Sequence, residues 1–415
     1  MDQFFKRAWR TRNSNARKPV SAQALAIISL FFVALPASAV LIDIDMGEAK
    51  NFTVLANTYN SGGDSSIVHG NVIAKTYAST GNGSTINGDY RSGDVLTLGD
   101  GGLITGNAES KGAGNVGANA TVEKTFVAGG VGTMGDSATV KNFISGGAGT
   151  IGAKGTVTGD WQVDGLATKS ASAYSAGSPM ATAIGYLQDR ATSHEADILN
   201  ATTKLETAKA ALTAMGPGTI LSSTYTTDGV LFAGVYSAPS WSTTDTGTGV
   251  VIELDAQGDK DAQWIFNIDD ILAFGANTNV VMIGLDLTPG VKNNQQVFWN
   301  VRTKGPGGYA SIGAKANIIG TIIAEDYIKV GAGATVYGAS PDSGNCGGVY
   351  STTSYVSVGA GAIIGSEGCA TGSTEVDPEG PGVIEPIPEP MTYTMLLAGL
   401  GLMGFVSRRR AKKAA

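Results

Sequence analysis

The chain has 415 residues, of which 42% are hydrophobic, and its 28 lysines and arginines against 35 aspartates and glutamates give a formal net charge of −7. An acidic protein repels nucleic acid and anionic lipid, so neither is an expected partner. Two histidines are too few for a convincing Ser-His-Asp triad or histidine-bound metal. No Walker A or dinucleotide-binding glycine motif is found either. We therefore expect no enzyme activity, no cofactor and no metal.

Residues 1–39 have the three parts of an export signal. Six basic residues, from Lys6 to Lys18, precede the uncharged run ALAIISLFFVAL, and small residues follow at Ala37 and Ala39. The apolar run is shorter than the ~20 residues that a membrane span needs. We predict cleavage after Ala39, with an uncleaved N-terminal anchor as the alternative.

Residues 85–173 repeat with a period of about eighteen residues, and three apolar columns appear when the repeats are aligned. The first column contains Ile86, Ile104, Val122, Val140 and Val157. The second contains Tyr90, Ala108, Phe126, Ile144 and Trp161. The third contains Leu98, Val116, Met134 and Ile151, followed directly by Gly99, Gly117, Gly135 and Gly152.

Apolar columns at a fixed period indicate repeats that bury their cores on one another. Short β-favouring pieces separated by glycine predict a mainly β fold, a β-solenoid with about eighteen residues per coil and three short faces. We expect the glycine column to mark a corner with positive φ, which glycine tolerates.

A long helix is predicted at about 179–215. Ser178-Pro179 is a typical helix start and Gly216-Pro217 a typical stop. Between them, apolar residues recur every seven positions in two series that make one stripe: Met180, Leu187, His194, Ala201 and Ala208, and Ile184, Ala191, Ile198, Leu205 and Leu212. Such a helix can lie along the solenoid and cover one face. We interpret His194 as a packed residue rather than a ligand.

The repeat returns after the helix. Ile312, Val330 and Val358 continue the third column, each with a following glycine at 313, 331 and 359, and Ile318 and Val336 continue the first. Both halves are therefore predicted to be coils of one solenoid domain, residues 40–376. The insertion carrying Cys346 lengthens the last coil. We expect a Cys346–Cys369 disulfide that holds it near the terminal cap, with two free thiols as the alternative.

The C-terminal segment, residues 388–415, follows a Pro/Gly-rich linker at 377–387. Pro388, Glu389 and Pro390 precede an uncharged transmembrane stretch, residues 391–406, and a basic cluster that includes Arg408, Arg409 and Arg410. This order closely resembles the PEP-CTERM sorting signal of Gram-negative bacteria. The resemblance implies transient anchoring in the inner membrane, recognition by an exosortase-type processing enzyme, and delivery to the cell surface or matrix. A plain membrane anchor is the alternative.

The acidic character increases once both ends are removed. The N-terminal segment takes away six basic residues and one acidic residue, and the C-terminal segment five and one, which leaves 17 against 33 and a net charge of −16. The exclusion of nucleic acid and anionic lipid therefore holds more strongly for the exported part.

Three phrases in the second half carry a family resemblance: VVIELDAQGDKDAQWIFNID (250–269), QVFWNV (296–301) and IIGTIIAEDYIKVGAGATVYG (318–338). They resemble the microbial ice-binding family, from about Leu221 to Ala339 and more weakly from Phe52 to Gly165. The resemblance implies a discontinuous β-solenoid with a long helix alongside, which binds ice by a flat face of short side chains. This chain departs from it in its longer helix and Cys-bearing loop.

Two files of residues beside the apolar columns are candidates for a binding face. One contains Thr85, Leu103, Thr121, Thr139 and Thr156, and the other Thr97, Asn115, Thr133 and Thr150. In a solenoid such files repeat every ~4.8 Å, near the oxygen spacing of ice, and a threonine methyl and hydroxyl can order water. Stacked threonines also simply favour strands, and Leu103, Glu123 and Lys141 interrupt the neighbourhood.

The sequence thus predicts an exported solenoid that adsorbs to an ordered surface, most readily ice. The alternative is a structural or adhesive protein of the exopolysaccharide or biofilm matrix without ice activity. A group of aspartates (Asp255, Asp259, Asp261, Asp269 and Asp270) suggests calcium, but its spacing does not fit an EF-hand. We interpret these residues as solvated turn acids.

Overall fold

The structure, a computed structural model, describes residues 44–175, 184–244, 247, 249–286, 288, 290–303, 307–340 and 345–367, and of residues 184–195 the backbone only. The predicted signal segment 1–39, linker 377–387 and sorting segment 388–415 lie outside these ranges. Within the described ranges, no helix is both long and apolar enough to cross a membrane.

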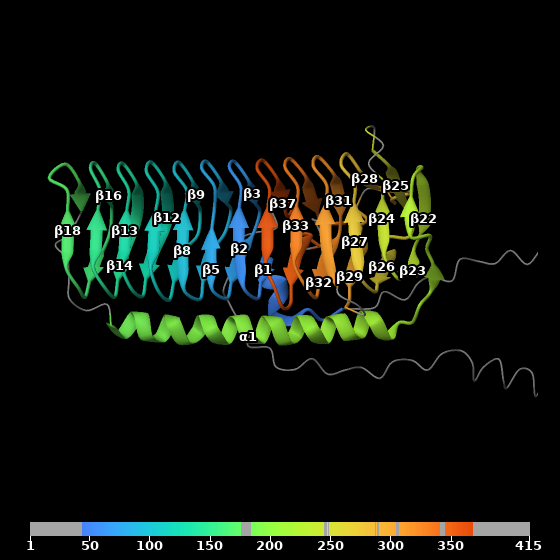
Figure 1. Ribbon diagram of the computed structural model, residues 1–415, viewed down its shortest axis with the longest axis horizontal. Helices are drawn as coiled ribbons and strands as arrows, with labels where there is room; N and C mark the ends of the chain where they lie inside the picture. The colour runs from blue at the N-terminus through green and yellow to red at the C-terminus, as the bar shows by residue number, and fades with distance from the viewer. Residues whose placement is uncertain are drawn as a thin grey trace, which may run out of the picture.

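The described chain forms one stack of parallel β-coils with a long helix along its side (Figure 1). The strands fall on three faces, which confirms the predicted mainly β solenoid. We name the faces the open sheet, the helix face and the narrow face. The open sheet is a 13-stranded parallel sheet. Its strands are β2 (Tyr59–Gly62), β5 (Tyr77–Ser79), β8 (Val95–Leu98), β11 (Gly114–Val116), β13 (Gly132–Met134), β15 (Gly149–Ile151), β18 (Ala167–Lys169), β21 (Thr224–Tyr225), β24 (Trp241–Thr243), β27 (Ile271–Phe274), β30 (Tyr309–Ile312), β33 (Ile328–Val330) and β36 (Val356–Val358).

The other two faces share a 24-stranded sheet, because β12 (Thr121–Ala128) and β14 (Thr139–Ser145) run through both. The helix face also contains β1 (Phe52–Ala56), β4 (Asn71–Ala74), β7 (Tyr90–Ser92), β10 (Ala108–Ser110), β17 (Trp161–Val163), β20 (Thr219–Ile220), β23 (Gly234–Ala238), β26 (Gln263–Ile268), β29 (Gln296–Val301), β32 (Thr321–Ala324) and β35 (Gly348–Ser351). The narrow face also contains β3 (Ile67–Val68), β6 (Thr85–Ile86), β9 (Leu103–Ile104), β16 (Thr156–Val157), β19 (Tyr174–Ser175), β22 (Gly229–Phe232), β25 (Val251–Asp255), β28 (Asn279–Ile283), β31 (Asn317–Ile319), β34 (Thr335–Tyr337) and β37 (Ile363–Ile364).

The predicted apolar columns line the inside of the stack, with one correction. Register pairs the first and third columns as expected, for example Ile104 with Val122 and Val116 with Met134. In the second column, however, Phe126 pairs with Phe143 rather than with Ile144. The repeat that is one residue short loses that residue between Val140 and Asn142, where the register shifts, so Ile144 faces outward on the helix face.

The glycine column does mark a corner, but the predicted reason for it is wrong. None of Gly99, Gly117, Gly135 and Gly152 has a positive φ. The left-handed residue stands two positions later, as at Gly101 (φ 66°). The columnar glycines are needed because successive corners touch: a Cβ on Gly99 would lie 2.4 Å from the Gly81 carbonyl oxygen. Gly313 shows the same close approach, with its Cβ site 2.5 Å from the carbonyl carbon of Gly275.

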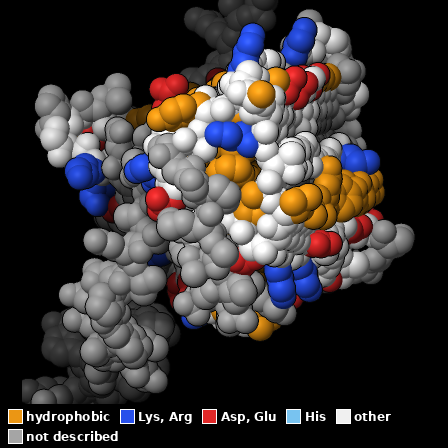
Figure 2. All heavy atoms as spheres, turned by 90° about the vertical axis from the view of Figure 1, so that its left-hand side faces the viewer, with side chains coloured by type: hydrophobic (Ala, Val, Ile, Leu, Met, Phe, Trp, Pro, Cys, Tyr) orange, Lys and Arg blue, Asp and Glu red, His pale blue; other side chains and the backbone are white. Residues whose placement is uncertain are grey.

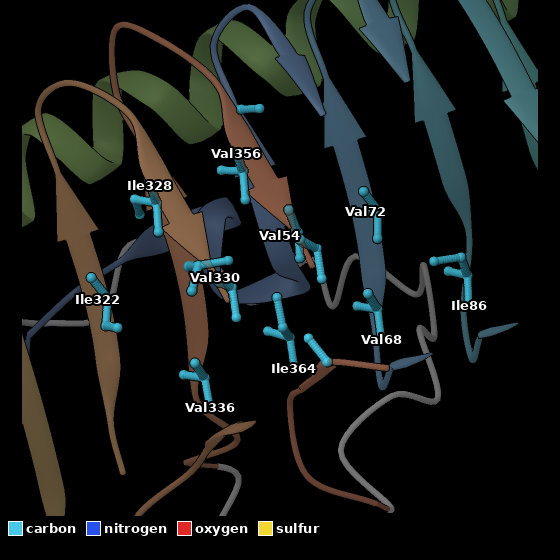
Figure 3. Packing of buried hydrophobic residues seen from close by; sticks show 14 of the residues in the cluster. Val54, Val68, Val72, Ile86, Ile322, Ile328, Val330, Val336, Val356 and Ile364 are labelled. Carbon is cyan, nitrogen blue, oxygen red and sulfur yellow. The ribbon is translucent and has the colours of Figure 1, made fainter. Parts of the chain in front are cut away.

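The chain follows the stack in two segments that run in the same direction along its axis, and the helix runs between them in the opposite direction. Residues 52–175 run from the middle to the β18 end, the helix returns along the side, and residues 219–364 run from the β21 end back to the middle (Figure 1). There the last coil meets the first, with β36 beside β2 and β35 beside β1. Side chains from both halves share one core at this junction (Figure 3), including Val54 and Val356, which are fully buried.

This path corrects the predicted place of the Cys346 loop. The coil that carries it lies at the central junction, not at a terminal cap, because β35 and β37 pair with the first coil. No described cysteine is a free thiol. The proposed partner Cys369 lies outside the described residues, so the pairing Cys346–Cys369 stays a prediction.

Helix α1 (Ile184–Ala214) packs on the helix face through the predicted stripe. Its described part buries Ile198, Ala201, Leu205, Ala208 and Leu212 in a second core against strand residues and the 3-10 helix η1 (Gly47–Asn51). The predicted end at Gly216 is confirmed. The predicted start at Ser178-Pro179 lies outside the described residues, as does the side chain of His194.

Polar contacts fix where the helix sits along the stack. The amide of Asn267 donates to the Leu212 carbonyl at 2.9 Å, and the amide of Asn300 donates to Thr213 Oγ1 at 3.1 Å. Lys209 Nζ is buried and donates to the Val301 carbonyl at 2.6 Å. These bonds fix the register between helix and solenoid, which apolar packing alone specifies less tightly.

Candidate functional site

The open sheet is the face on which a surface-binding site is most readily built. Helix α1 covers the helix face, whereas no described helix or strand packs on the outer side of the open sheet (Figure 1). In each strand, alternate residues point into the core and outward, as the alternating burial of Val95–Leu98 shows. Two parallel files of outward residues therefore run the length of this sheet.

The first outward file consists almost entirely of short polar side chains. Register connects its members without a gap from one end of the stack to the other. In spatial order they are Thr168, Thr150, Thr133, Asn115, Thr97, Ser79, Ser61, Ser357, Lys329, Ser311, Ala273, Ser242 and Thr224. We name this the hydroxyl file. It crosses the central junction, where Ser61 Oγ donates to Ser357 Oγ at 3.2 Å.

The second outward file, two residues earlier in each strand, is apolar and changes in character along the stack. Toward the β18 end it has small and aliphatic side chains: Leu166, Ala148, Val131, Ala113 and Val95. In the central coils it has tyrosines: Tyr77, Tyr59, Tyr355, Tyr327 and Tyr309. Ile271 follows in register. The open sheet is thus a Val/Ala/Thr surface on one side and a Tyr/Ser surface in its centre.

The structure divides the predicted threonines between two faces. Thr97, Thr133 and Thr150 belong to the hydroxyl file of the open sheet. The remaining four (Thr85, Thr121, Thr139 and Thr156) form a file on the narrow face. This second file continues through Ile67 and Ile363 and contains Leu103, so its surface is chemically mixed.

The hydroxyl file carries little charge. Acidic and basic side chains are distributed around the β18 end of the molecule (Figure 2). Along the hydroxyl file, all of whose members are described, Lys329 is the one charged residue. Its ammonium lies 4.9 Å from the Tyr327 ring centroid. Its hydrogen bond to Tyr355 raises its pKa, so it stays protonated near neutral pH.

The tyrosines, the serines and the full extent of the file were not predicted from the sequence. The signal was present, because Tyr59 and Tyr77 are eighteen residues apart, as are Tyr309 and Tyr327. The step from Tyr327 to Tyr355 is hidden by the insertion in the last coil. The contact between Tyr59 and Tyr355 depends on the junction, which no local pattern reveals.

Two of the aspartates considered for calcium, Asp255 and Asp259, act as turn acids as interpreted from the sequence, whereas Asp269 is ion-paired rather than solvated. Asp255 accepts a hydrogen bond from the Gln257 amide at 2.9 Å, and Asp259 accepts one from the Asp261 amide at 2.9 Å. Asp269 forms an ion pair with Arg302. Among the described residues, no group of three His, Cys, Asp or Glu side chains could hold a metal ion.

Residues 104–363 match the model of the ice-binding-like family. Because this match covers more than half of the chain, the protein belongs to the ice-binding-like family, as the resemblance of its second half had implied. Residues 386–410 match the PEP-CTERM protein-sorting motif, so this member of the family carries a C-terminal sorting signal, as its sequence had implied.

Several solved structures are similar to this chain. An ice-binding protein from the Antarctic ascomycete Antarctomyces psychrotrophicus is 16% identical, with a TM-score of 0.40 over 78% of this chain and 98% of that one. An ice-binding protein domain from Shewanella frigidimarina is 18% identical, with a TM-score of 0.39 over 77% and 95%. A glycosylated ice-binding protein from an Arctic yeast is 14% identical, with a TM-score of 0.36 over 83% and 96%. No curated protein is significantly similar in sequence.

Proposed function

We propose that the protein is exported and adsorbs to ice through the open sheet, centred on Thr97, Thr133 and Thr150. The observation that supports this function is the hydroxyl file, which runs in register over thirteen strands on an uncovered sheet. Thr85, Thr121, Thr139 and Thr156 belong to the narrow face and are proposed as ladder residues that are dispensable for ice.

The mechanism requires no chemistry beyond adsorption. Paired strands hold the threonines at a fixed repeat of about 4.8 Å, and the buried core beneath them keeps the backbone rigid. Each hydroxyl bonds surface water while the threonine methyl and the neighbouring Val131 and Ala148 side chains limit competing contacts. Because the surface is pre-organised, little conformational entropy is lost when it meets an ordered water lattice.

A matched pair of variants tests this proposal. The segment 40–387 contains every residue of both large cores, from Ile44 to Ile364, and is the unit to purify. We expect it to show thermal hysteresis and inhibit ice recrystallisation. Thr133→Tyr, on the open sheet, should remove most of this activity, because a tyrosine ring protrudes beyond the neighbouring threonines. Thr139→Tyr, in the following strand on the narrow face, should leave it unchanged. Absence of activity in the unmodified segment, or equal loss in both variants, would refute the proposal.

The chain ends supply the route to the surface. We propose that residues 1–39 direct export and are removed after Ala39. An exosortase-type enzyme then processes the segment after Pro388-Glu389-Pro390 while residues 391–406 anchor it transiently in the inner membrane. Replacing Glu389 with alanine should trap the full-length chain in the membrane fraction, detectable by immunoblotting.

Extracellular polysaccharide is a second candidate partner. The specific observation that favours it is the change from aliphatic side chains to tyrosines in the central coils of the open sheet. A protein that binds both ligands would attach ice to the matrix around the cell.

A further inference from the structure

Five tyrosines form a continuous row across the centre of the open sheet. The rings of Tyr309 and Tyr327 stack with centroids 4.7 Å apart, those of Tyr327 and Tyr355 at 5.2 Å, and those of Tyr355 and Tyr59 at 4.6 Å. Tyr77 extends the row in register with Tyr59. We name these five residues the tyrosine ridge. Tyr59 and Tyr77 keep 38% and 40% of their surface exposed, so the ridge is accessible.

The tyrosine ridge stands higher than the hydroxyl file that runs beside it. Because the four rings of Tyr309, Tyr327, Tyr355 and Tyr59 lie within 10° of parallel and stack from coil to coil, their faces cover one another and their edges form the accessible surface of the row. Beside it runs the central part of the hydroxyl file (Ser311, Lys329, Ser357, Ser61 and Ser79), whose serines are shorter than tyrosine. The result is an apolar wall next to a hydroxyl floor, both repeating once per coil.

The ridge is also electrically neutral. Burial raises the pKa of Tyr59 and of Tyr327, so both phenols keep their protons at neutral pH and can donate as well as accept hydrogen bonds. Lys329, the one cation in the adjoining part of the hydroxyl file, lies 4.9 Å from the Tyr327 ring centroid. With a net charge of −16 on the exported part, the protein as a whole repels a polyanion.

The shape, spacing and neutrality of the tyrosine ridge define the ligand that it can bind. It must be extended, repeat at about the coil spacing of 4.8 Å, carry many hydroxyls and be uncharged. Flat ice fits the aliphatic half better, because the tyrosines rise above the plane of the hydroxyl file. A peptide strand would need an unpaired sheet edge, which the outer side of a sheet does not offer.

We infer that the tyrosine ridge and the serine floor beside it bind one extended, uncharged polysaccharide chain that runs parallel to the solenoid axis. Sugar hydroxyls bond to the serines and phenols, and sugar C–H groups pack against the ring edges. This inference rests on the second candidate function, the matrix partner, and is independent of ice adsorption by the threonine half.

A triple variant tests the ridge without disturbing the backbone. Tyr309, Tyr327 and Tyr355 are each replaced by valine, the residue that the same file already carries at Val95 and Val131. The probe is hydroxyethyl cellulose, a soluble neutral β-linked glucan, set in a native affinity gel. Tyr174→Val, an exposed tyrosine on the narrow face, is the matched control. We expect the 40–387 segment and the control to be retarded, and the triple variant to bind about tenfold or more weakly, as when several aromatic anchors are lost together.

Two further readouts keep the result decisive. Supporting the inference requires that the triple variant keep its denaturation midpoint and its ice recrystallisation inhibition. No retardation of the unmodified segment would overturn it, even with full ice activity. If the triple variant lost retardation and also had a lower denaturation midpoint, the Tyr59–Tyr355 stack would instead be a contact that stabilises the junction. Loss of ice inhibition alone would make the ridge part of the ice surface, and either outcome rejects a polysaccharide site.

Discussion

Substituting one glycine of the corner column tests whether glycine is needed there for a left-handed backbone or for the close approach of successive coils. In Gly99→Ala, the new Cβ would lie 2.4 Å from the Gly81 carbonyl oxygen and 2.5 Å from its carbonyl carbon. Both atoms are backbone, so the corner can accept the methyl group only by moving two coils apart. Overpacking typically costs about 1–3 kcal/mol of unfolding free energy, and contact with backbone atoms, which cannot rotate away, places Gly99→Ala at the upper end, about 3 kcal/mol.

The matched substitution lies two residues away in the same corner. A Cβ on Gly101 meets nothing within 4 Å, but its φ of +66° is unfavourable for alanine. Gly101→Ala should therefore cost only about 1 kcal/mol, the usual penalty for a left-handed residue. Gly101→Asn should cost still less, because Asn119 occupies the equivalent position with a φ of 56°.

Chemical denaturation of the 40–387 segment measures all three variants. The order of midpoints, from lowest to highest, should be Gly99→Ala, Gly101→Ala and Gly101→Asn, with unchanged denaturant dependence. If Gly99→Ala were no more destabilising than Gly101→Ala, close approach of the corners would not be what the glycine column provides. Gly152→Ala and Gly313→Ala repeat the test in the two halves of the chain.

Three further predictions concern the helix, a buried ion pair and the cysteines. Burial lowers the pKa of Lys209 to about 8 from the ordinary 10.5. Between these values the unfolded chain binds more protons, so raising the pH from 8 to 10 should stabilise the wild type by about 2 kcal/mol relative to Lys209→Met in paired denaturation curves. Arg91 is buried between Asp89 at 3.0 Å and Glu109 at 3.8 Å, so Arg91→Met should cost about 3–5 kcal/mol by stranding carboxylates, and a smaller loss would show that water reaches them. If Cys346 and Cys369 are bridged, native protein should resist alkylation until it is reduced and unfolded; rapid labelling of both without reductant would exclude the bridge.

Most of the fold was predictable because the eighteen-residue repeat shows which side chains must be buried. A column such as Ile86–Ile104–Val122 must face inward in every coil, so the repeat alone gives register and the long stripe alone gives the docked face of the helix. The place of Ile144 was not predictable, since the alignment does not say where a short repeat loses its residue. The reason for the glycines was not predictable either. A need for positive φ and a close contact between coils both select glycine, so the sequence shows the same column in either case.

The candidate site was harder to predict than the fold because its neighbours come from different parts of the chain. Ser61 and Ser357 stand in adjacent coils although they are 296 positions apart in the sequence. Aligning the repeats of the first half identifies Thr97, Thr133 and Thr150. It does not extend past the start of the helix, where the repeat is interrupted. The chemistry of an outward file depends on the order of coils in space, and the central junction changes that order.

The junction also explains how one face can carry two chemistries. Coils 59–79 and 309–357 meet there, and only the pairing of β2 with β36 brings Tyr59 onto Tyr355. A row of five tyrosines, four of them stacked, therefore requires matching residues in both halves of the solenoid sequence, although the core beneath needs only apolar side chains such as Val356. The inward-facing core does not require tyrosine on the outer side, since Val95 occupies the same outward file one coil beyond the ridge. The outward tyrosines are therefore assigned to the proposed polysaccharide ligand, and the threonines beyond them to the proposed adsorption to ice.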